Sequence, residues 1–286
     1  MRKAAAAEPL PGVPALHRLT QDGIQIRKGE LVMVAGIPNS GKSAFVLWLT
    51  ASMGLPTLYF SADTSAHDTL TRLLSYTTQI ERRRIESDLD DEQIGQVMEG
   101  QYAEALKSSP LQFVFDGSLT LKQVTSELNA YVEIFDEWPE VIVVDNLINV
   151  EGTGDHEGQS GILSELHYLA RLTGAAVFVL HHCSESNGQD PLRAPPQSAI
   201  QNKVSHYLDL IITVAMNSLT GDFQAAAVKV RSGRNDPKAQ RPYTLYSDMS
   251  RCTFHADSPN VPPWSPSGWA REENGGQSQQ EHRYGS

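Results

Sequence analysis

The chain has 286 residues, of which 40% are hydrophobic, and its formal net charge is −11. This length allows one large α/β domain with short appendages, or two small domains at most. The acidic balance argues against a protein coated in positive charge to grip nucleic acid, although it does not exclude a local basic channel. No apolar run is long enough to span a membrane and there are only two cysteines, so we expect a reduced, cytoplasmic protein without a membrane span.

Short apolar runs alternate with segments of helical spacing along most of the chain. Residues 1–15 are rich in Ala and Pro and predict a flexible arm, and the main domain is expected over residues 16–256. Strands are predicted at residues 31–35, 57–60, 111–115, 141–144 and 175–180, and helices at 42–53, within 65–107, at 121–135 and up to 173. This alternation predicts an α/β fold with a mainly parallel central sheet and helices on both faces.

The last part of the chain has a different character. A glycine-rich loop at residues 151–161 precedes the helix that ends near 173, and residues 208–215, 225–231 and 243–246 predict strands joined by turns. They would form a β-rich C-terminal extension. From residue 257 the composition shifts to Pro, Gly, Ser, Gln and Glu, which predicts a disordered tail.

The strongest motif is Gly36-Ile37-Pro38-Asn39-Ser40-Gly41-Lys42-Ser43, which matches the pattern G-x-x-x-x-G-K-[ST] of a phosphate-binding loop. Glycines let the backbone N–H groups point at phosphates, the lysine brings a positive charge, and the serine hydroxyl ligates Mg²⁺. The motif lies between a predicted strand and a predicted helix, as such a loop requires. We therefore predict nucleotide contacts from Gly36, Pro38, Asn39, Ser40, Gly41, Lys42, Ser43 and Ala44.

Two acidic residues follow predicted strands. Asp145 ends the run Val141-Ile142-Val143-Val144, where a carboxylate can hold Mg²⁺ opposite Ser43. Asp63 follows the strand at residues 57–60 and could orient the attacking water, but from the residues alone a cap of the next helix is the favoured interpretation.

With these motifs in place, the chain resembles the RecA-like ATPase domain of DnaB-type replicative helicases from about residue 16 to 254. It is similar to the compact RepA-type hexameric helicases and to phage-encoded helicases. Gly29-Glu30-Leu31 and Phe60-Ser61-Ala62-Asp63 belong to the resemblance. It implies a RecA-like P-loop fold that uses ATP and Mg²⁺, with Asp63 where the family usually has a catalytic glutamate. Because aspartate is one methylene shorter, the efficiency of hydrolysis stays open.

The resemblance also assigns three residues further along the chain. It places His182 as a sensor of the γ-phosphate, and Lys229 and Arg231 as cations that reach the nucleotide of a neighbouring subunit. Alternatively, Lys229 and Arg231 could be two solvated cations on an exposed strand. Zinc binding by His181 and His182 is not expected, since neighbouring strand residues point to opposite faces.

Two loops would line the central channel of such a ring. The loop at residues 152–161 has no Lys or Arg, whereas the loop at 184–203 offers Arg193, Gln197 and Lys203 for the backbone of single-stranded DNA. Both could also be ordinary surface loops.

The function implied by the resemblance is an ATP-dependent DNA helicase. It would form a homo-oligomer, a hexameric ring that moves along single-stranded DNA, and the tail could dock a replication partner through its aromatic residues. Two alternatives stay open from the sequence. One is a RecA-like recombinase or recombination mediator, and the other is a nucleotide-gated helicase loader or regulator with weak hydrolysis.

Overall fold

The computed structural model describes residues 7–184, 190–203 and 205–256. The chain divides into two units, residues 1–256 and 257–286. The predicted tail, with its proposed docking role, therefore lies outside the described residues.

The elements are η1 (Pro14–Leu16), α1 (His17–Gln21), β1 (Leu31–Gly36), α2 (Lys42–Met53), β2 (Thr57–Ser61), α3 (Ala66–Thr78), α4 (Arg82–Asp90), α5 (Glu92–Lys107), β3 (Leu111–Phe115), α6 (Leu121–Phe135), β4 (Val141–Asp145), η2 (Leu147–Asn149), α7 (His156–Thr173), β5 (Ala176–His182), η3 (Gln197–Ala199), η4 (Gln201–Lys203), β6 (Leu210–Met216), β7 (Asp222–Val230), β8 (Tyr243–Asp248) and β9 (Thr253–His255).

One sheet runs through the first unit, with its nine strands in the order β3-β2-β4-β5-β1-β6-β7-β8-β9. The strands from β3 to β6 are parallel, and β7, β8 and β9 continue the sheet with antiparallel pairings. Parallel strands need crossover helices, which is why apolar strand segments alternate with helical spacing in the sequence. The predicted α/β fold with a parallel core and a β-rich C-terminal extension is confirmed.

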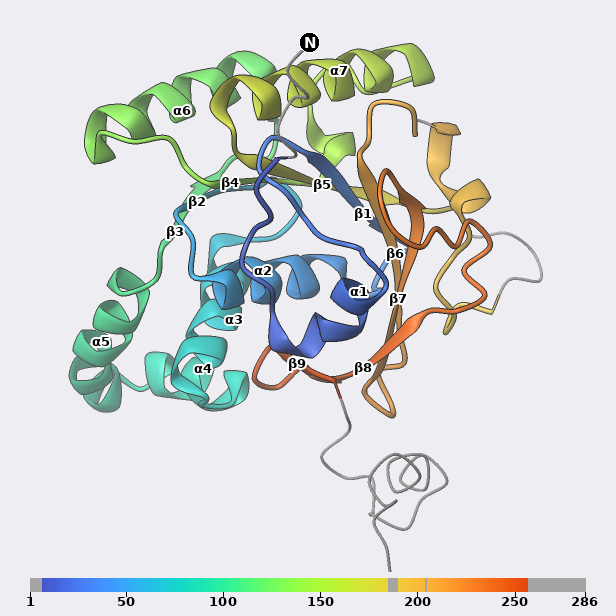
Figure 1. The fold of residues 1–286 in the computed structure, drawn as a ribbon. Helices are drawn as coiled ribbons and strands as arrows, with labels where there is room; N and C mark the ends of the chain where they lie inside the picture. The colour runs from blue at the N-terminus through green and yellow to red at the C-terminus, as the bar shows by residue number, and fades with distance from the viewer. Residues whose placement is uncertain (1–6, 185–189, 204, 257–286) are drawn as a thin grey trace, which may run out of the picture. The chain divides into compact units, whose positions relative to one another are not determined.

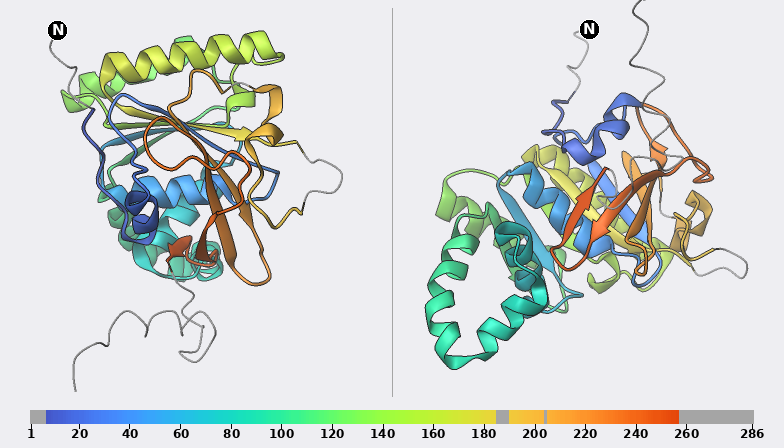
Figure 2. Two further views of the ribbon diagram at one scale, coloured as in Figure 1. Left: turned by 45° about the vertical axis from the view of Figure 1, so that its right-hand side comes forward. Right: turned by 90° about the horizontal axis from the view of Figure 1, so that it is seen from below.

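Helices cover both faces of the sheet, with α6 and α7 on one face and α2 and α3 on the other (Figure 1; Figure 2). The alternation of side chains along β1 shows how each face is filled. Val32 and Val34 belong to the core that contains Phe45 of α2, whereas Met33 belongs to the core that contains Leu163 of α7. A strand that is apolar on both faces is typical of a fully covered parallel sheet. No helix in the described ranges is long and apolar enough to cross a membrane.

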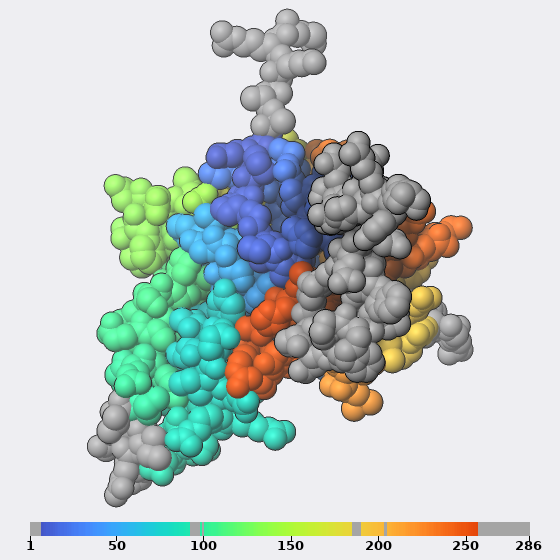
Figure 3. All heavy atoms as spheres, turned by 60° about the horizontal axis from the view of Figure 1, so that its bottom comes forward, coloured from blue at the N-terminus to red at the C-terminus, as the bar shows by residue number. Residues whose placement is uncertain are grey.

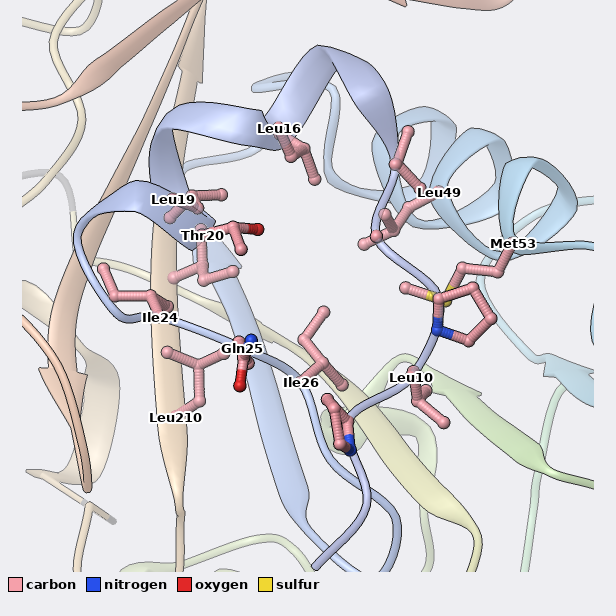
Figure 4. A pocket seen from close by; sticks show the side chains of 15 residues that line it. Leu10, Leu16, Leu19, Thr20, Ile24, Gln25, Ile26, Leu49, Met53 and Leu210 are labelled. Carbon is pink, nitrogen blue, oxygen red and sulfur yellow. The ribbon is translucent and has the colours of Figure 1, made fainter.

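The segment before β1 is not the loose arm that the sequence predicts. Leu10 and Val13 are buried, and Leu10 N–H donates to Ile26 O at 2.8 Å. Together with α1 they close a small apolar cavity, of about 140 Å³, over Leu49 and Met53 of α2 (Figure 4). The Ala- and Pro-rich composition hid two apolar residues that bury surface, and residues 1–6 lie outside the described residues.

Contacts with Arg234 and Tyr243 hold this N-terminal segment in place. Asp22 Oδ2 accepts a hydrogen bond from Tyr243 Oη at 2.5 Å and pairs with Arg234 Nη1 at 3.0 Å. Figure 3 shows the segment, in dark blue, beside the red strands at the end of the described chain. The N-terminal segment is therefore part of the folded unit.

The glycine-rich loop expected at residues 151–161 is shorter than predicted, because α7 begins at His156. Asp155 caps this helix by accepting a hydrogen bond from Gly158 N–H at 2.8 Å. A side chain at Gly158 would collide with Gly152 O, so glycine is required there. Gly158 thus allows the backbone of Gly152 to lie close to the start of α7, and the glycines do not form a long loop.

Candidate functional site

The backbone of the loop between β1 and α2 curls tightly around an open centre. Asn39 and Gly41 have positive φ angles of 60° and 82°. A Cβ at Gly36 would strike Ser40 Oγ and would lie 2.6 Å from Val214 O, so only glycine fits there. Successive N–H groups in such a left-handed turn face a common centre and bind anions.

Lys42 begins α2 and is held close to the loop that precedes it. Its ammonium donates to Gly36 O at 3.2 Å and to Ile37 O at 2.9 Å. Burial lowers the pKa of Lys42, while the negative charge of Asp145 acts in the opposite direction. Ser40 Oγ is also buried and has no hydrogen-bond partner among the described residues. A tethered cation and an unsatisfied hydroxyl both suit phosphate oxygens.

Asp145 lies at the carboxyl end of β4 with 2% of its surface exposed. Its Oδ2 accepts a hydrogen bond from Tyr59 Oη at 2.9 Å, and the Ser43 hydroxyl also bonds to it. Burial raises the pKa of Asp145, and the bonds from Ser43 and Tyr59 lower it. The structure therefore brings the two predicted metal ligands, Ser43 and Asp145, into contact, and their hard oxygen atoms are the kind that Mg²⁺ prefers.

A cavity of about 450 Å³ opens beside the loop. Its lining contains every loop residue predicted to contact nucleotide except Gly36, and it also contains Asp63 and His182. Asp63 is exposed, and its backbone N–H donates to Asp145 O at 3.3 Å. Residues from the ends of β1, β2 and β5 thus meet at one edge of the sheet, where α/β proteins bind ligands.

His182 is held by Asn146, a residue that the sequence interpretation missed. Asn146 Oδ1 accepts a hydrogen bond from Ile148 N–H at 3.4 Å, so the amide nitrogen faces His182 Nε2 at 2.9 Å. Because the amide can only donate, Nε2 accepts and the neutral ring carries its proton on Nδ1. Burial lowers the pKa of His182, and Nδ1 has no partner among the described residues. The ring therefore offers an unused donor on a residue that lines the cavity.

His181 and His182 face different elements. His181 Nε2 donates to Gln201 O at 3.2 Å on the far side of β5 from Asn146. Their separate partners agree with the expectation that adjacent strand residues do not share one metal ion.

Arg72 of α3 also lines the cavity, and no sequence motif pointed to it. It is half-buried, and its charge lowers the pKa of Tyr59 against the dominant effect of burial. The sequence did not point to Arg72, because a single Arg in an amphipathic helix is common. Tyr59 was likewise hidden within an apolar strand run.

Lys229 and Arg231 are not at this cavity. Lys229 Nζ donates to Ser205 O, and Arg231 Nη1 lies 2.7 Å from Asp209 Oδ1. Because β7 is antiparallel to β6 and pairs Val230 with Leu210, both cations lie at the amino edge of the parallel strands. β1 spans the sheet from edge to edge in six residues. At about 3.3 Å per residue, roughly 17 Å separate the two edges, too far for an arginine side chain to cross.

The predicted DNA-binding residues are only partly described. Arg193 is exposed, and Gln197 is half-buried in η3 with its N–H bonded to Pro237 O at 2.9 Å. The side chain of Lys203 and residues 185–189 lie outside the described part of the chain. This segment follows β5, so it begins at the same edge of the sheet as the cavity.

A family model described as the DnaB-like helicase C-terminal domain matches residues 12–240 of the chain. The chain is 32% identical over 250 residues to the Gene 65 protein of Mycobacterium phage L5. This alignment covers 83% of this chain and 89% of that protein. It is 27% identical over 223 residues to the replicative DNA helicase DnaB of a Nostoc species, which covers 73% of this chain and 25% of that protein.

Solved structures share the fold. One of them, an ATPase domain, superposes with a TM-score of 0.70 at 17% identity, covering 88% of this chain and 93% of that one. A DnaB-like replicative helicase, solved in a study of its interactions with primase, also gives a TM-score of 0.70 at 16% identity, and the match covers 86% of this chain and 62% of that one. With the P-loop, Asp145 and the cavity in the arrangement described above, the chain belongs to the DnaB-like helicase C-terminal domain family and is an ATP-dependent helicase.

Proposed function

We propose that the chain assembles into a homo-oligomer, a hexameric ring in which ATP is bound between adjacent subunits and hydrolysed as the ring moves along single-stranded DNA. The observation that carries this proposal is the placement of Arg231. It lies at the amino edge of the sheet, whereas the phosphate-binding loop follows the carboxyl edge. An arginine so placed cannot reach its own loop, but it can reach the loop of a neighbouring copy.

The residues singled out by the sequence have distinct roles in this proposal. The loop backbone and Lys42 bind the phosphates of ATP, and Ser43 and Asp145 would hold Mg²⁺, which neutralises charge on the phosphate oxygens. Asp63, exposed at the mouth of the cavity, orients the attacking water. His182 donates from Nδ1 to the γ-phosphate, and Arg231 of the neighbouring subunit, with Lys229 beside it, stabilises charge that develops on the transferred group.

Single-stranded DNA would contact the loop at residues 184–203 through Arg193, Gln197 and Lys203. Arg193 is exposed and forms no ion pair with the described residues, so its charge is free for a phosphate. The loop leaves β5 directly after His182, so a displacement of the loop by DNA is transmitted over a few residues to the cavity. This short connection provides a physical route from DNA binding to hydrolysis.

A regulator that binds ATP but hydrolyses it weakly is the second candidate, because Asp63 is shorter than the glutamate usual in the family. The rate of ATP hydrolysis, measured with and without single-stranded DNA, separates the two candidates, and Lys42→Ala provides the control. A Lys42-dependent rate that rises several-fold with DNA supports the motor. A negligible rate in both conditions, with ATP binding retained, contradicts it and favours the regulator.

A further inference from the structure

Asp209 is a carboxylate fixed at the amino edge of the sheet, directly before β6. Its side chain is fully buried, and Oδ2 accepts a hydrogen bond from Leu31 N–H at 2.9 Å. Its own N–H donates to Leu31 O at 2.9 Å. The first residue of β1 therefore holds both the backbone and the side chain of Asp209, so the carboxylate has little freedom to move.

Cationic side chains surround the other carboxylate oxygen. Oδ1 accepts no hydrogen bond of good geometry from the described residues, and Arg231 Nη1 lies 2.7 Å from it. Arg171 of α7 is farther away, at 3.9 Å, and His167 Nε2 lies 3.6 Å from Oδ2. Burial lowers the pKa of His167, so the ring is neutral near pH 7. Arg231 is thus the close cation that balances the buried charge.

The ion pair with Asp209 engages only one nitrogen of the Arg231 guanidinium. Its side chain is 57% exposed, and its backbone N–H also donates to Asp209 O at 3.1 Å. A guanidinium has five N–H donors, so one nitrogen paired with Asp209 leaves the others open to solvent. A free arginine side chain loses rotamer entropy when it engages a ligand, and a side chain held in advance loses less.

The surface next to Arg231 has the character of a protein interface. Tyr168 and Leu172 of α7 are each 63% exposed, and they adjoin His167 and Arg171 on the same helix. Large apolar side chains exposed beside a charged group are typical of surfaces that another protein covers. The apolar pair therefore supports a neighbouring subunit at this edge of the sheet.

We propose that Asp209 is a positioning residue for catalysis in the neighbouring subunit: it fixes the Arg231 guanidinium so that the free N–H donors point at the phosphates of ATP bound by the adjacent copy. This inference rests on the proposed shared site. Asp209 touches no nucleotide and acts through Arg231 alone. Donors fixed before the reaction stabilise developing charge without reorganisation.

The test begins with Asp209→Asn, which keeps an acceptor for Leu31 N–H but removes the charge that holds Arg231. We expect kcat for ATP hydrolysis to fall roughly 10- to 100-fold, as for a misplaced catalytic group, with KM for ATP unchanged. KM is unaffected because the variant's own phosphate-binding loop lies at the opposite edge of the sheet. Arg171→Ala, which removes the more distant cation of the same cluster, is the matched control and should change kcat less than about twofold.

Mixed assemblies separate positioning from a loss of folding. Lys42→Ala subunits have a defective loop but an intact Arg231, so they should complement Asp209→Asn subunits. Mixing the two should restore turnover above the sum of the separate preparations, just as mixing Lys42→Ala with Arg231→Ala should. No recovery with Asp209→Asn, while the Arg231→Ala mixture recovers, overturns the positioning role alone. No recovery in either mixture overturns the shared site and the positioning role together.

Asp209→Ser covers the case in which the amide variant does not fold, since serine removes the same charge with a smaller side chain. Circular dichroism and binding of a fluorescent ATP analogue establish that each variant is folded with an intact loop. A folded variant that retains full kcat without the Asp209 carboxylate contradicts the inference.

Discussion

The two edges of the central sheet differ in how their polar groups are satisfied. At the carboxyl edge, Ser40 Oγ and His182 Nδ1 are buried without partners among the described residues, beside a cavity of about 450 Å³. At the amino edge, Asp209 Oδ1 and His167 Nε2 also lack a hydrogen bond of good geometry among the described residues, but a cation is present, because Arg231 Nη1 pairs with Asp209 Oδ1 at 2.7 Å. Unsatisfied buried groups are rare in folded proteins and indicate a ligand, whereas a paired but exposed guanidinium presents a prepared cation.

This difference supports the proposal that each edge is half of a site. In this proposal the carboxyl edge would bind ATP and Mg²⁺ and carry the candidate base. The described residues that line its cavity include only Lys42 and Arg72 as permanent cations. The amino edge supplies a further cation, while the phosphate-binding loop lies at the opposite edge. Two copies of the chain, placed edge to edge, would provide both halves at one place.

The largest effect is expected from Arg231→Ala. Loss of a cation that stabilises the transferred phosphoryl group lowers kcat by about 10³-fold or more. Binding of ATP to the isolated chain, measured by equilibrium titration, should be unchanged because Arg231 is remote from the loop. Equal losses of ATP binding and turnover would mean that the two edges are not independent.

A smaller effect is expected at Asp63. Asp63→Asn removes the group proposed to orient the water and should lower kcat about 100-fold, within the usual range for a general base. Asp63→Glu restores the side chain usual in the family and should keep or raise the rate. Steady-state hydrolysis checks both variants. If Asp63→Asn were as fast as the original chain, Asp63 would be only a surface residue at the mouth of the cavity.

Tyr59→Phe should shift the pH dependence of hydrolysis. The Tyr59 hydroxyl bond lowers the pKa of Asp145, so its removal raises that pKa further above the ordinary value. A carboxylate with a higher pKa loses its charge, and its hold on Mg²⁺, at a higher pH. The acid limb of the kcat profile should therefore move to higher pH, with a loss of roughly tenfold at most at neutral pH. An unmoved acid limb would show that Asp145 does not control it.

The smallest effect is on stability in acid. Burial lowers the pKa of His181 to about 4 from 6.5, so the folded chain favours the neutral ring. The contribution of the neutral ring to the free energy of unfolding is fully present above pH 6.5. It is lost as the pH falls towards 4, because the unfolded chain takes up the proton first. We expect a loss on the order of 1 kcal/mol by about pH 5, which His181→Gln should remove. Thermal melts of both chains between pH 7 and pH 5 provide the comparison.

Much of the fold and the centre of the site could be predicted because local patterns encode them. The P-loop motif and the apolar run ending in Asp145 are contiguous in the sequence, and the structure places both where their spacing predicts. The parallel sheet follows from the alternation of strands and helices. The roles of these residues in catalysis stay predictions.

The residues that the sequence did not reveal depend on neighbours in space. Tyr59 matters because β2 lies beside β4, and Asn146 matters because β4 lies beside β5. Asp209 is buried beside Arg231 only because β7 returns antiparallel to β6. A strand order that differs from chain order brings these pairs together, and no spacing along a single chain predicts it.

The most direct test of the shared site mixes Lys42→Ala and Arg231→Ala chains, each of which should be almost inactive in ATP hydrolysis alone. In a mixed assembly, some interfaces combine an intact loop from one chain with an intact arginine from the other. The proposal predicts that ATP hydrolysis, stimulated by single-stranded DNA, returns in proportion to these interfaces. If the two variants assemble with each other but the mixture is no more active than the separate chains, the two edges do not form one site.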